Sequence, residues 1–320
     1  MILTLAMLLI SCGTTTPTAT PTREPEPTLP ASATLDPPSV TPRLTTTGDP
    51  TRTPRPTDSK ATATPAATVT SAPASWQDMP IIPTGVSDRM REVYQRGLQL
   101  GRDPRAFAKI GDCGGTPSWF LGPFDDEPEG YRLGEYTYLV DVIEHFAGSY
   151  GRASVAARPG FNVSSIFSPL WSDPEQCRSG EGPLICEIRV TNATYAFFMM
   201  GTNDVWHQDK FESQMRRAIE DLLERGVVPI LSTKADNVEQ DDSINAAIVR
   251  LALEYEAPLW NYWAAAQPLP DHGLQEDGVH LTWAGNRFDD PEAMARGWPV
   301  RNLTALQALD AVWRGITEQK

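Results

Sequence analysis

The stretch ATYAFFMMGTND, residues 193–204, decides the fold of this chain. Ala193 to Met200 is a continuous apolar run, which is the pattern of a strand buried on both faces of a parallel sheet. Gly201-Thr202-Asn203-Asp204 follows directly where such a strand ends. Ligand sites in open α/β sheets lie beyond the carboxyl ends of the strands. The stretch therefore predicts a sheet core followed by a functional loop.

The segments around this strand alternate between helix and strand patterns. Apolar residues at helical spacing predict helices over 86–100, 136–146, 211–225, 244–255 and 303–316. Short apolar runs predict further strands over 106–110, 227–231 and 258–262. Strands that alternate with helices form βαβ units. The sequence thus predicts an α/β fold, a three-layer sandwich in which helices flank a central, mostly parallel sheet.

The first residues have the pattern of an export signal. Ile2 to Ile10 is an apolar run that is too short to span a bilayer. It ends in Leu9-Ile10-Ser11-Cys12, which resembles a bacterial lipobox. That resemblance implies cleavage before Cys12 and lipid on its thiol, so we expect a lipid-anchored protein on the extracytoplasmic face of the cell membrane. The alternative is an ordinary signal peptide with a chance cysteine, and no Lys or Arg precedes the apolar run.

A Thr/Pro-rich segment separates this signal from the rest of the chain. Residues 13–75 hold 19 Thr and 13 Pro, and almost no large apolar side chains. Such a composition buries too little apolar surface to offset the entropy of ordering. We therefore expect a disordered tether over 13–76 and one folded domain over 77–320. Charges cancel before residue 77, so the formal net charge of −14 belongs to the folded domain, which would repel nucleic acid.

The four cysteines fall into different settings. Cys177 and Cys186 lie nine positions apart around a Gly-containing segment, which favours a local disulfide in an exported protein. The alternative is two free thiols. Cys113 then stays unpaired in Gly111-Asp112-Cys113-Gly114-Gly115, directly after a predicted strand. An unpaired thiol outside the cytosol calls for a chemical reason.

Four short motifs follow one another in the folded domain: Gly111-Asp112-Cys113, Gly160, Gly201-Thr202-Asn203-Asp204 and Asp277-Gly278-Val279-His280. Their order and spacing resemble those of the SGNH/GDSL hydrolases, whose blocks carry Ser, Gly, Asn and His. The resemblance covers about residues 105–320. It implies a flavodoxin-like three-layer fold and the hydrolysis of ester bonds without a cofactor. This chain departs from the family pattern in one place, because Cys113 replaces the nucleophilic serine.

The residues also make chemical sense without the resemblance. Acyl transfer needs a nucleophile, a base and donors for the developing oxyanion. His280 is the candidate base, and Asp277 can hold its imidazole in the right tautomer. Asn203 offers a side-chain amide and Gly160 a closely approaching backbone N–H. The resemblance implies that these two groups and the N–H of Cys113 form the oxyanion hole. Taken singly, each of these residues is explained equally well as a turn or surface residue and as a catalytic residue.

Three aromatic or basic residues next to the motifs are candidates for a substrate rim: Trp119, Trp206 and His207. Aromatic faces stack on sugar rings, although ordinary core or surface packing explains them equally well. The histidines show no metal-ligand spacing. We therefore expect neither a metal nor a cofactor.

Cysteine in place of serine leaves three interpretations open. In the first interpretation, Cys113 is a working nucleophile whose pKa is lowered by His280 or by a following helix N-terminus. Alternatively, the site is disabled and the domain only binds carbohydrate or envelope components, or Cys113 is inert and other groups act. The sequence favours the first, a hydrolase of small acyl esters such as O-acetyl groups on carbohydrate. Acyl transfer to a carbohydrate instead of water stays open.

Overall fold

The computed structural model describes residues 75–125 and 128–318. The signal segment, Cys12 and the tether up to residue 74 lie outside the described residues, so the predictions made for them are not tested here. None of the described helices is both long and apolar enough to cross a membrane.

A four-stranded sheet forms the centre of the fold. Its strands are β1 (Asp103–Gly111), β3 (Ala193–Met199), β4 (Val228–Ser232) and β5 (Leu259–Trp260), and their order is β1-β3-β4-β5. Every neighbouring pair is parallel. All seven residues of β3 are buried, as the continuous apolar run predicts. The second, two-stranded sheet pairs β2 (Tyr131–Arg132) with β6 (Asn286–Arg287).

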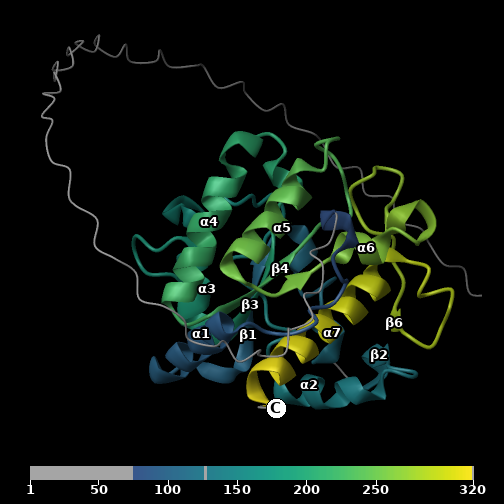
Figure 1. The fold of residues 1–320 in the computed structure, drawn as a ribbon, viewed down its shortest axis with the longest axis horizontal. Coiled ribbons are helices and arrows are strands. Elements are labelled where there is room, and N and C mark those ends of the chain that lie inside the picture. The colour runs from purple at the N-terminus through teal and green to yellow at the C-terminus, as the bar shows by residue number, and fades with distance from the viewer. Residues whose placement is uncertain (1–74, 126–127, 319–320) are drawn as a thin grey trace, which may run out of the picture. The chain divides into compact units, whose positions relative to one another are not determined.

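Helices cover the central sheet on two sides (Figure 1). One group is α3 (Pro183–Thr191), α4 (Gln208–Glu224) and α5 (Ser243–Tyr255); the other is α1 (Asp88–Gln99), α2 (Val140–His145), α6 (Tyr262–Ala266) and α7 (Gly297–Thr317). Helices α4 and α5 pack together against β4, while α7 packs against α1, α2 and α6. The three-layer α/β fold with a parallel central sheet is therefore confirmed.

The elements differ from the predicted ranges mainly at their ends. β5 has two residues where five were expected, and the expected 136–146 helix is a 3-10 turn followed by the short α2. α7 begins at Gly297, six residues before the predicted start, so it includes Arg301 and Asn302. Helices α3 and α6 and the β2–β6 pair were not anticipated from the sequence.

Two glycines allow the backbone of α1 to contact the backbone of the turn that follows α4. A Cβ on Gly97 would lie 2.3 Å from the carbonyl oxygen of Gly226, and a Cβ on Gly226 would lie 2.4 Å from the Cα of Gly97. Gly226 also has a φ of +68°, which favours glycine. Because both contacts are with backbone, neither neighbour can turn aside.

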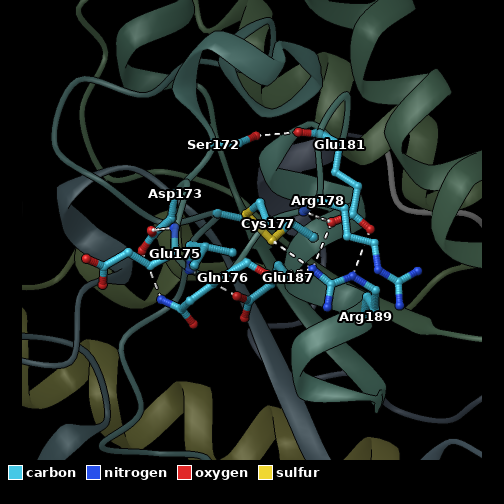
Figure 2. Close-up of a disulfide and its surroundings, with 12 residues drawn as sticks. Ser172, Asp173, Glu175, Gln176, Cys177, Arg178, Glu181, Glu187 and Arg189 are labelled. Atoms are coloured by element: carbon cyan, nitrogen blue, oxygen red, sulfur yellow. Dashed lines mark hydrogen bonds and ion pairs between the residues drawn. A yellow bond between two sulfur atoms is a disulfide. The ribbon is translucent and has the colours of Figure 1, made fainter.

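Cys177 and Cys186 form the predicted disulfide, shown in Figure 2. It joins the loop that precedes α3 to the first turns of that helix. Glu181 lies between the two cysteines and pairs with Arg189 of α3 at 2.8 Å. Hydrogen bonds from Arg189 lower the pKa of Glu181 to about 2. The disulfide and this ion pair fix the same short segment twice.

Candidate active site

The carboxyl ends of three sheet strands open into one pocket. β1 leads into Asp112 and Cys113, β3 into Met200 and Thr202, and β4 into Thr233 and Lys234. The segment 279–281 and the first turns of α7 complete the pocket. Its position beyond the carboxyl ends of the strands is the one expected for a ligand site in a parallel sheet. Its lining includes three charged side chains besides Asp112 and His280, namely Lys234, Asp236 and Arg301.

Cys113 begins a short 3-10 turn, Cys113–Gly115, directly after β1. Asp112 caps the turn, because its carboxylate accepts the N–H of Gly114 at 2.8 Å. The hydroxyl of Thr116 donates to the carbonyl of Cys113 at 2.9 Å. These bonds fix the backbone on both sides of a half-buried thiol. Cys113 is the one cysteine without a disulfide in the described part of the chain.

The thiol of Cys113 has a raised pKa. Burial is the largest cause, and the neighbouring Asp112 carboxylate adds to it; the N–H of Gly114 and the charge of Arg301 act in the opposite direction. Our expectation of a lowered pKa is therefore wrong. The 3-10 turn has only three residues, Cys113 included, so no long helix dipole supports a thiolate there. No hydrogen bond joins its sulfur to the ring of His280 among the described residues.

Asp277 and His280 form a directly bonded pair at the mouth of the pocket. The Nδ1 atom of His280 lies 2.6 Å from a carboxylate oxygen of Asp277. The other oxygen accepts the backbone N–H groups of Val279 and His280, each at 2.9 Å. The bond to His280 and these two N–H groups lower the pKa of Asp277 to about 2. Because an ionised carboxylate accepts, Nδ1 carries a proton, and in the neutral form of the ring the lone pair is on Nε2.

Both members of this pair are exposed, with 57% of the His280 side chain and 47% of the Asp277 side chain accessible. His280 and Cys113 line the same pocket, whereas Asp277 lies outside its lining. The structure thus brings two of the three predicted catalytic residues to one cavity and bonds the third to the second.

Gly160 and Asn203 lie outside that lining. The amide nitrogen of Asn203 donates to the carbonyl of Phe161 at 3.0 Å, so it joins the loop of Gly160 to its own loop. The second amide hydrogen has no partner among the described residues. A Cβ on Gly160 would meet nothing within 4 Å, so close approach does not explain this glycine. Its φ of +80° does.

The three candidate rim residues occupy different places. Trp119 stacks on Trp298, a pocket-lining residue, with ring centroids 5.7 Å apart. Its loop is fastened to α7, because the amide of Asn302 donates to the carbonyl of Trp119 at 3.0 Å. Trp206 is 81% exposed, and neither it nor His207 lines the pocket.

Sequence reasoning missed a buried cluster of charges. The ammonium of Lys234 donates to Asp236 at 2.8 Å and to Glu239 at 2.6 Å. Asp236 also accepts the hydroxyl of Thr202 at 2.8 Å, which links the ends of β3 and β4. The only sequence signal was a Lys and an Asp directly after the apolar strand 228–232. Within 75–125 and 128–318, no three His, Cys, Asp or Glu side chains gather as a metal ion requires.

Asp204 was also missed as a buried acid. One of its oxygens accepts the N–H of Val163 at 3.0 Å, and the other has no partner in the described structure. Burial, with a smaller contribution from Asp112, raises the pKa of Asp204 to about 6. Asp204 therefore stabilises the turn after β3 at the cost of a poorly solvated carboxyl group.

Solved structures of ester hydrolases are similar to this fold. An acetylxylan esterase from Geobacillus stearothermophilus is 17% identical, with 65% of this chain and 95% of that chain covered and a TM-score of 0.40. A psychrotrophic esterase from Pseudoalteromonas sp. is 10% identical over 64% and 97%, with a TM-score of 0.40. A GDSL-like lipase from Bacteroides thetaiotaomicron is 14% identical over 69% and 98%, with a TM-score of 0.39.

At such low identities and TM-scores, no activity is assigned to this chain from these structures. No family model and no curated protein matches the sequence.

Proposed function

We propose that this chain hydrolyses small acyl esters through an acyl-enzyme intermediate on Cys113. The observation that carries the proposal is the pocket shared by Cys113 and His280, with His280 held by Asp277 so that Nε2 keeps its lone pair. A nucleophile, a base and a group that orients the base are the parts that acyl transfer requires. SGNH/GDSL hydrolases, which the motifs resemble, use the same arrangement with serine.

The reaction proceeds in two balanced steps. Nε2 of His280 takes the thiol proton while the sulfur attacks the ester carbonyl carbon; the C–O bond then breaks and the alcohol leaves with that proton. Water next gives a proton to His280 and attacks the thioester, and the C–S bond breaks as the sulfur regains the proton. The raised thiol pKa favours proton removal during attack over a resting thiolate.

The oxyanion hole consists, in this proposal, of the N–H groups of Cys113 and Gly160 and the amide of Asn203. The bond from Asn203 to Phe161 supports this assignment, because it holds two of the donors on joined loops. One amide hydrogen of Asn203 stays available for an oxyanion. Substrate would have to draw these loops and Cys113 around its carbonyl, because Gly160 and Asn203 lie outside the pocket lining.

The proposed substrates are short acyl groups, such as O-acetyl groups on carbohydrate. The stacked pair of Trp119 and Trp298 supports a sugar, because aromatic faces pack on sugar rings. We further propose that lipid on Cys12 holds the protein at the extracytoplasmic face of the cell membrane. The disulfide Cys177–Cys186 fits an oxidising compartment. Replacing Cys12 by Ala should release the protein from the membrane fraction.

A binding module without catalysis is the second candidate. It is favoured by the raised pKa of Cys113 and by the lack of a hydrogen bond between its sulfur and the ring of His280 among the described residues. The same cleft would then hold a carbohydrate or another envelope component without cleaving it.

Hydrolysis of p-nitrophenyl acetate by the wild type, Cys113→Ala and Cys113→Ser distinguishes the two candidates. We expect Cys113→Ala to lose the rate above background, because it lacks the nucleophile. Equal rates in all three proteins would contradict the enzyme and favour the binding module. A faster Cys113→Ser would mean that the remaining groups work and that sulfur slows them. Added oligosaccharide that gains acyl groups would identify transfer in place of hydrolysis.

A further inference from the structure

Arg301 of α7 is a buried cation in the wall of the pocket. Only 7% of the residue is accessible, yet it lines the same cavity as Cys113. Its guanidinium carbon lies over four aromatic rings, at 4.9–6.0 Å from their centroids: Phe120, Trp260, Tyr262 and Trp298. Such contacts hold the guanidinium in place, but they supply no hydrogen-bond acceptor in its plane.

The guanidinium of Arg301 has no polar partner in the described structure. None of its nitrogens takes part in a hydrogen bond or an ion pair with the described residues, and Nε is fully buried without an acceptor. The other buried cation of the pocket, Lys234, donates to two carboxylates. A buried charge without a partner is costly. Asp112 and Asp236 attract Arg301 through space, but no acceptor in the described structure takes a hydrogen bond from its guanidinium.

Neighbouring polar groups are already engaged with other partners. The hydroxyl of Tyr262 donates to Gly297 at 3.0 Å, and the indole N–H of Trp260 donates to Thr304 at 3.0 Å. Asp112 accepts from Gly114, and Asp236 accepts from Thr202 and Lys234. The hydrogen bonds of Tyr262, Trp260 and Asp236 thus go to other partners, and Asp112 attracts Arg301 only through space.

The position of Arg301 relates it to the nucleophile. One of its terminal nitrogens lies 3.7 Å from the point that a Cβ on Gly114, the residue after Cys113, would occupy. Arg301 thus lies beside the residue that follows the nucleophile, and both Arg301 and Cys113 line the same pocket. The aromatic rings around Arg301 exclude water, which strengthens a charge-assisted hydrogen bond there.

We propose that Arg301 binds a free carboxylate of the substrate, so that the pocket selects esters that carry one negative charge besides the ester group. A planar guanidinium matches a carboxylate with two parallel hydrogen bonds. Asp112 and Asp236 line the same pocket and repel a second negative charge, which disfavours a phosphate dianion. The selection of esters rests on the proposed function, whereas carboxylate binding does not depend on catalysis.

Binding is tested with the full chain carrying Cys113→Ala, so that no ester is consumed. Calorimetry compares monomethyl succinate, which has one carboxylate, with dimethyl succinate, which has none. We expect the acid to bind at least about tenfold more tightly, because a charge-assisted hydrogen bond is lost in the diester. Introducing Arg301→Met into the Cys113→Ala protein should abolish the difference in affinity between the two esters. Added Arg296→Met is the matched control: it removes an exposed arginine next to the same helix and should keep the difference.

Equal binding of the two esters, or tighter binding of inorganic phosphate than of monomethyl succinate, would overturn the proposal. So would an Arg301→Met protein that stays folded and keeps the difference. If Arg301→Met fails to fold, the two-ester comparison without that change still decides. Wild-type protein that hydrolyses p-nitrophenyl acetate but does not discriminate the two succinates refutes this inference alone. Discrimination without any hydrolysis refutes the proposed function alone.

Discussion

Two sets of ionisable groups, one at the rim of the pocket and one buried in its lining, differ in their exposure to water. The rim pair, Asp277 and His280, is about half exposed, whereas the floor charges, Lys234, Asp236 and Arg301, are almost fully buried. Water and salt screen the rim pair, so it can change protonation state at little cost to the fold. Lys234 and Asp236 depend on each other, because a buried ion without its partner is destabilising, whereas the guanidinium of Arg301 has no hydrogen-bond partner among the described residues. The rim is thus suited to proton transfer and the floor to fixed electrostatics.

The strongest test of this contrast is His280→Ala. Loss of the general base should lower ester hydrolysis by about 10²–10⁴-fold. Because the side chain is exposed, the free energy of unfolding should stay within about 0.5 kcal/mol of the wild type. Steady-state kinetics and urea unfolding measure the two effects. His272→Ala, which also removes an exposed histidine, is the control for activity and should leave hydrolysis unchanged. A destabilised His280→Ala would mean that the rim pair is structural.

Lys234→Met tests the buried charges, for which we expect a large effect on stability. Asp236 and Glu239 would keep their buried carboxylates without a cation, so we expect a loss of about 3–5 kcal/mol in the free energy of unfolding. Chemical denaturation measures it. The exposed Lys210→Met of α4 is the control and should be nearly neutral. Should Lys234→Met lose less than about 1 kcal/mol, the floor is better solvated than its burial indicates.

Asp204→Asn extends the contrast to a buried acid next to Asn203. The pKa of Asp204 is raised to about 6 in the fold and would be near 4 in the unfolded chain. The native state therefore binds the extra proton between pH 4 and 6, and stability from this group is lost as the pH rises through that range. The variant should match the wild type near pH 4 and be about 1–3 kcal/mol more stable at pH 7. Urea unfolding at several pH values measures the difference; one that is independent of pH would contradict it.

Asp277→Asn should have the smallest effect on stability. An exposed charge pair contributes about 0.2–1 kcal/mol, so the free energy of unfolding should fall by no more than that. Added salt should reduce the stability gap between the two proteins, because it screens the pair in the wild type. Hydrolysis should fall much further, by about a hundredfold or more, because an amide does not hold His280 in the tautomer that leaves Nε2 as the base. A variant that keeps the wild-type rate would contradict the role of Asp277 in orienting His280.

The sequence predicted the elements whose patterns are long and regular. The apolar run 193–200 became β3, because a strand buried on both faces is apolar at every position. The amphipathic pattern of 211–225 became α4, because a helix buried along one side has apolar residues at helical spacing. The two-residue strands β2, β5 and β6 have no such trace. Helix α3 was missed because it is short, follows a segment that contains two glycines, and begins inside the disulfide loop.

The site divides in the same way. The motif of Cys113 follows β1 at the carboxyl end of the parallel sheet, where the strand pattern predicts a site, and the loop of His280 lines the same pocket without following a strand of that sheet. The direction of the pKa shift of Cys113 was not predictable, because it depends on burial and on the charge of Asp112. Arg301 lies in no motif and 188 positions from Cys113, so only the packing of α7 reveals it.

The contact between Gly97 and Gly226 also bears on how this fold can diverge. Each backbone fills the space that a methyl group on the other would need. A side chain introduced at either position would clash with the main chain of the other glycine. No compensating substitution can relieve that clash, because the other residue already has no side chain. Descendants of this gene should consequently carry both glycines, or show α1 displaced from the turn as a unit, with no gradual route between the two outcomes.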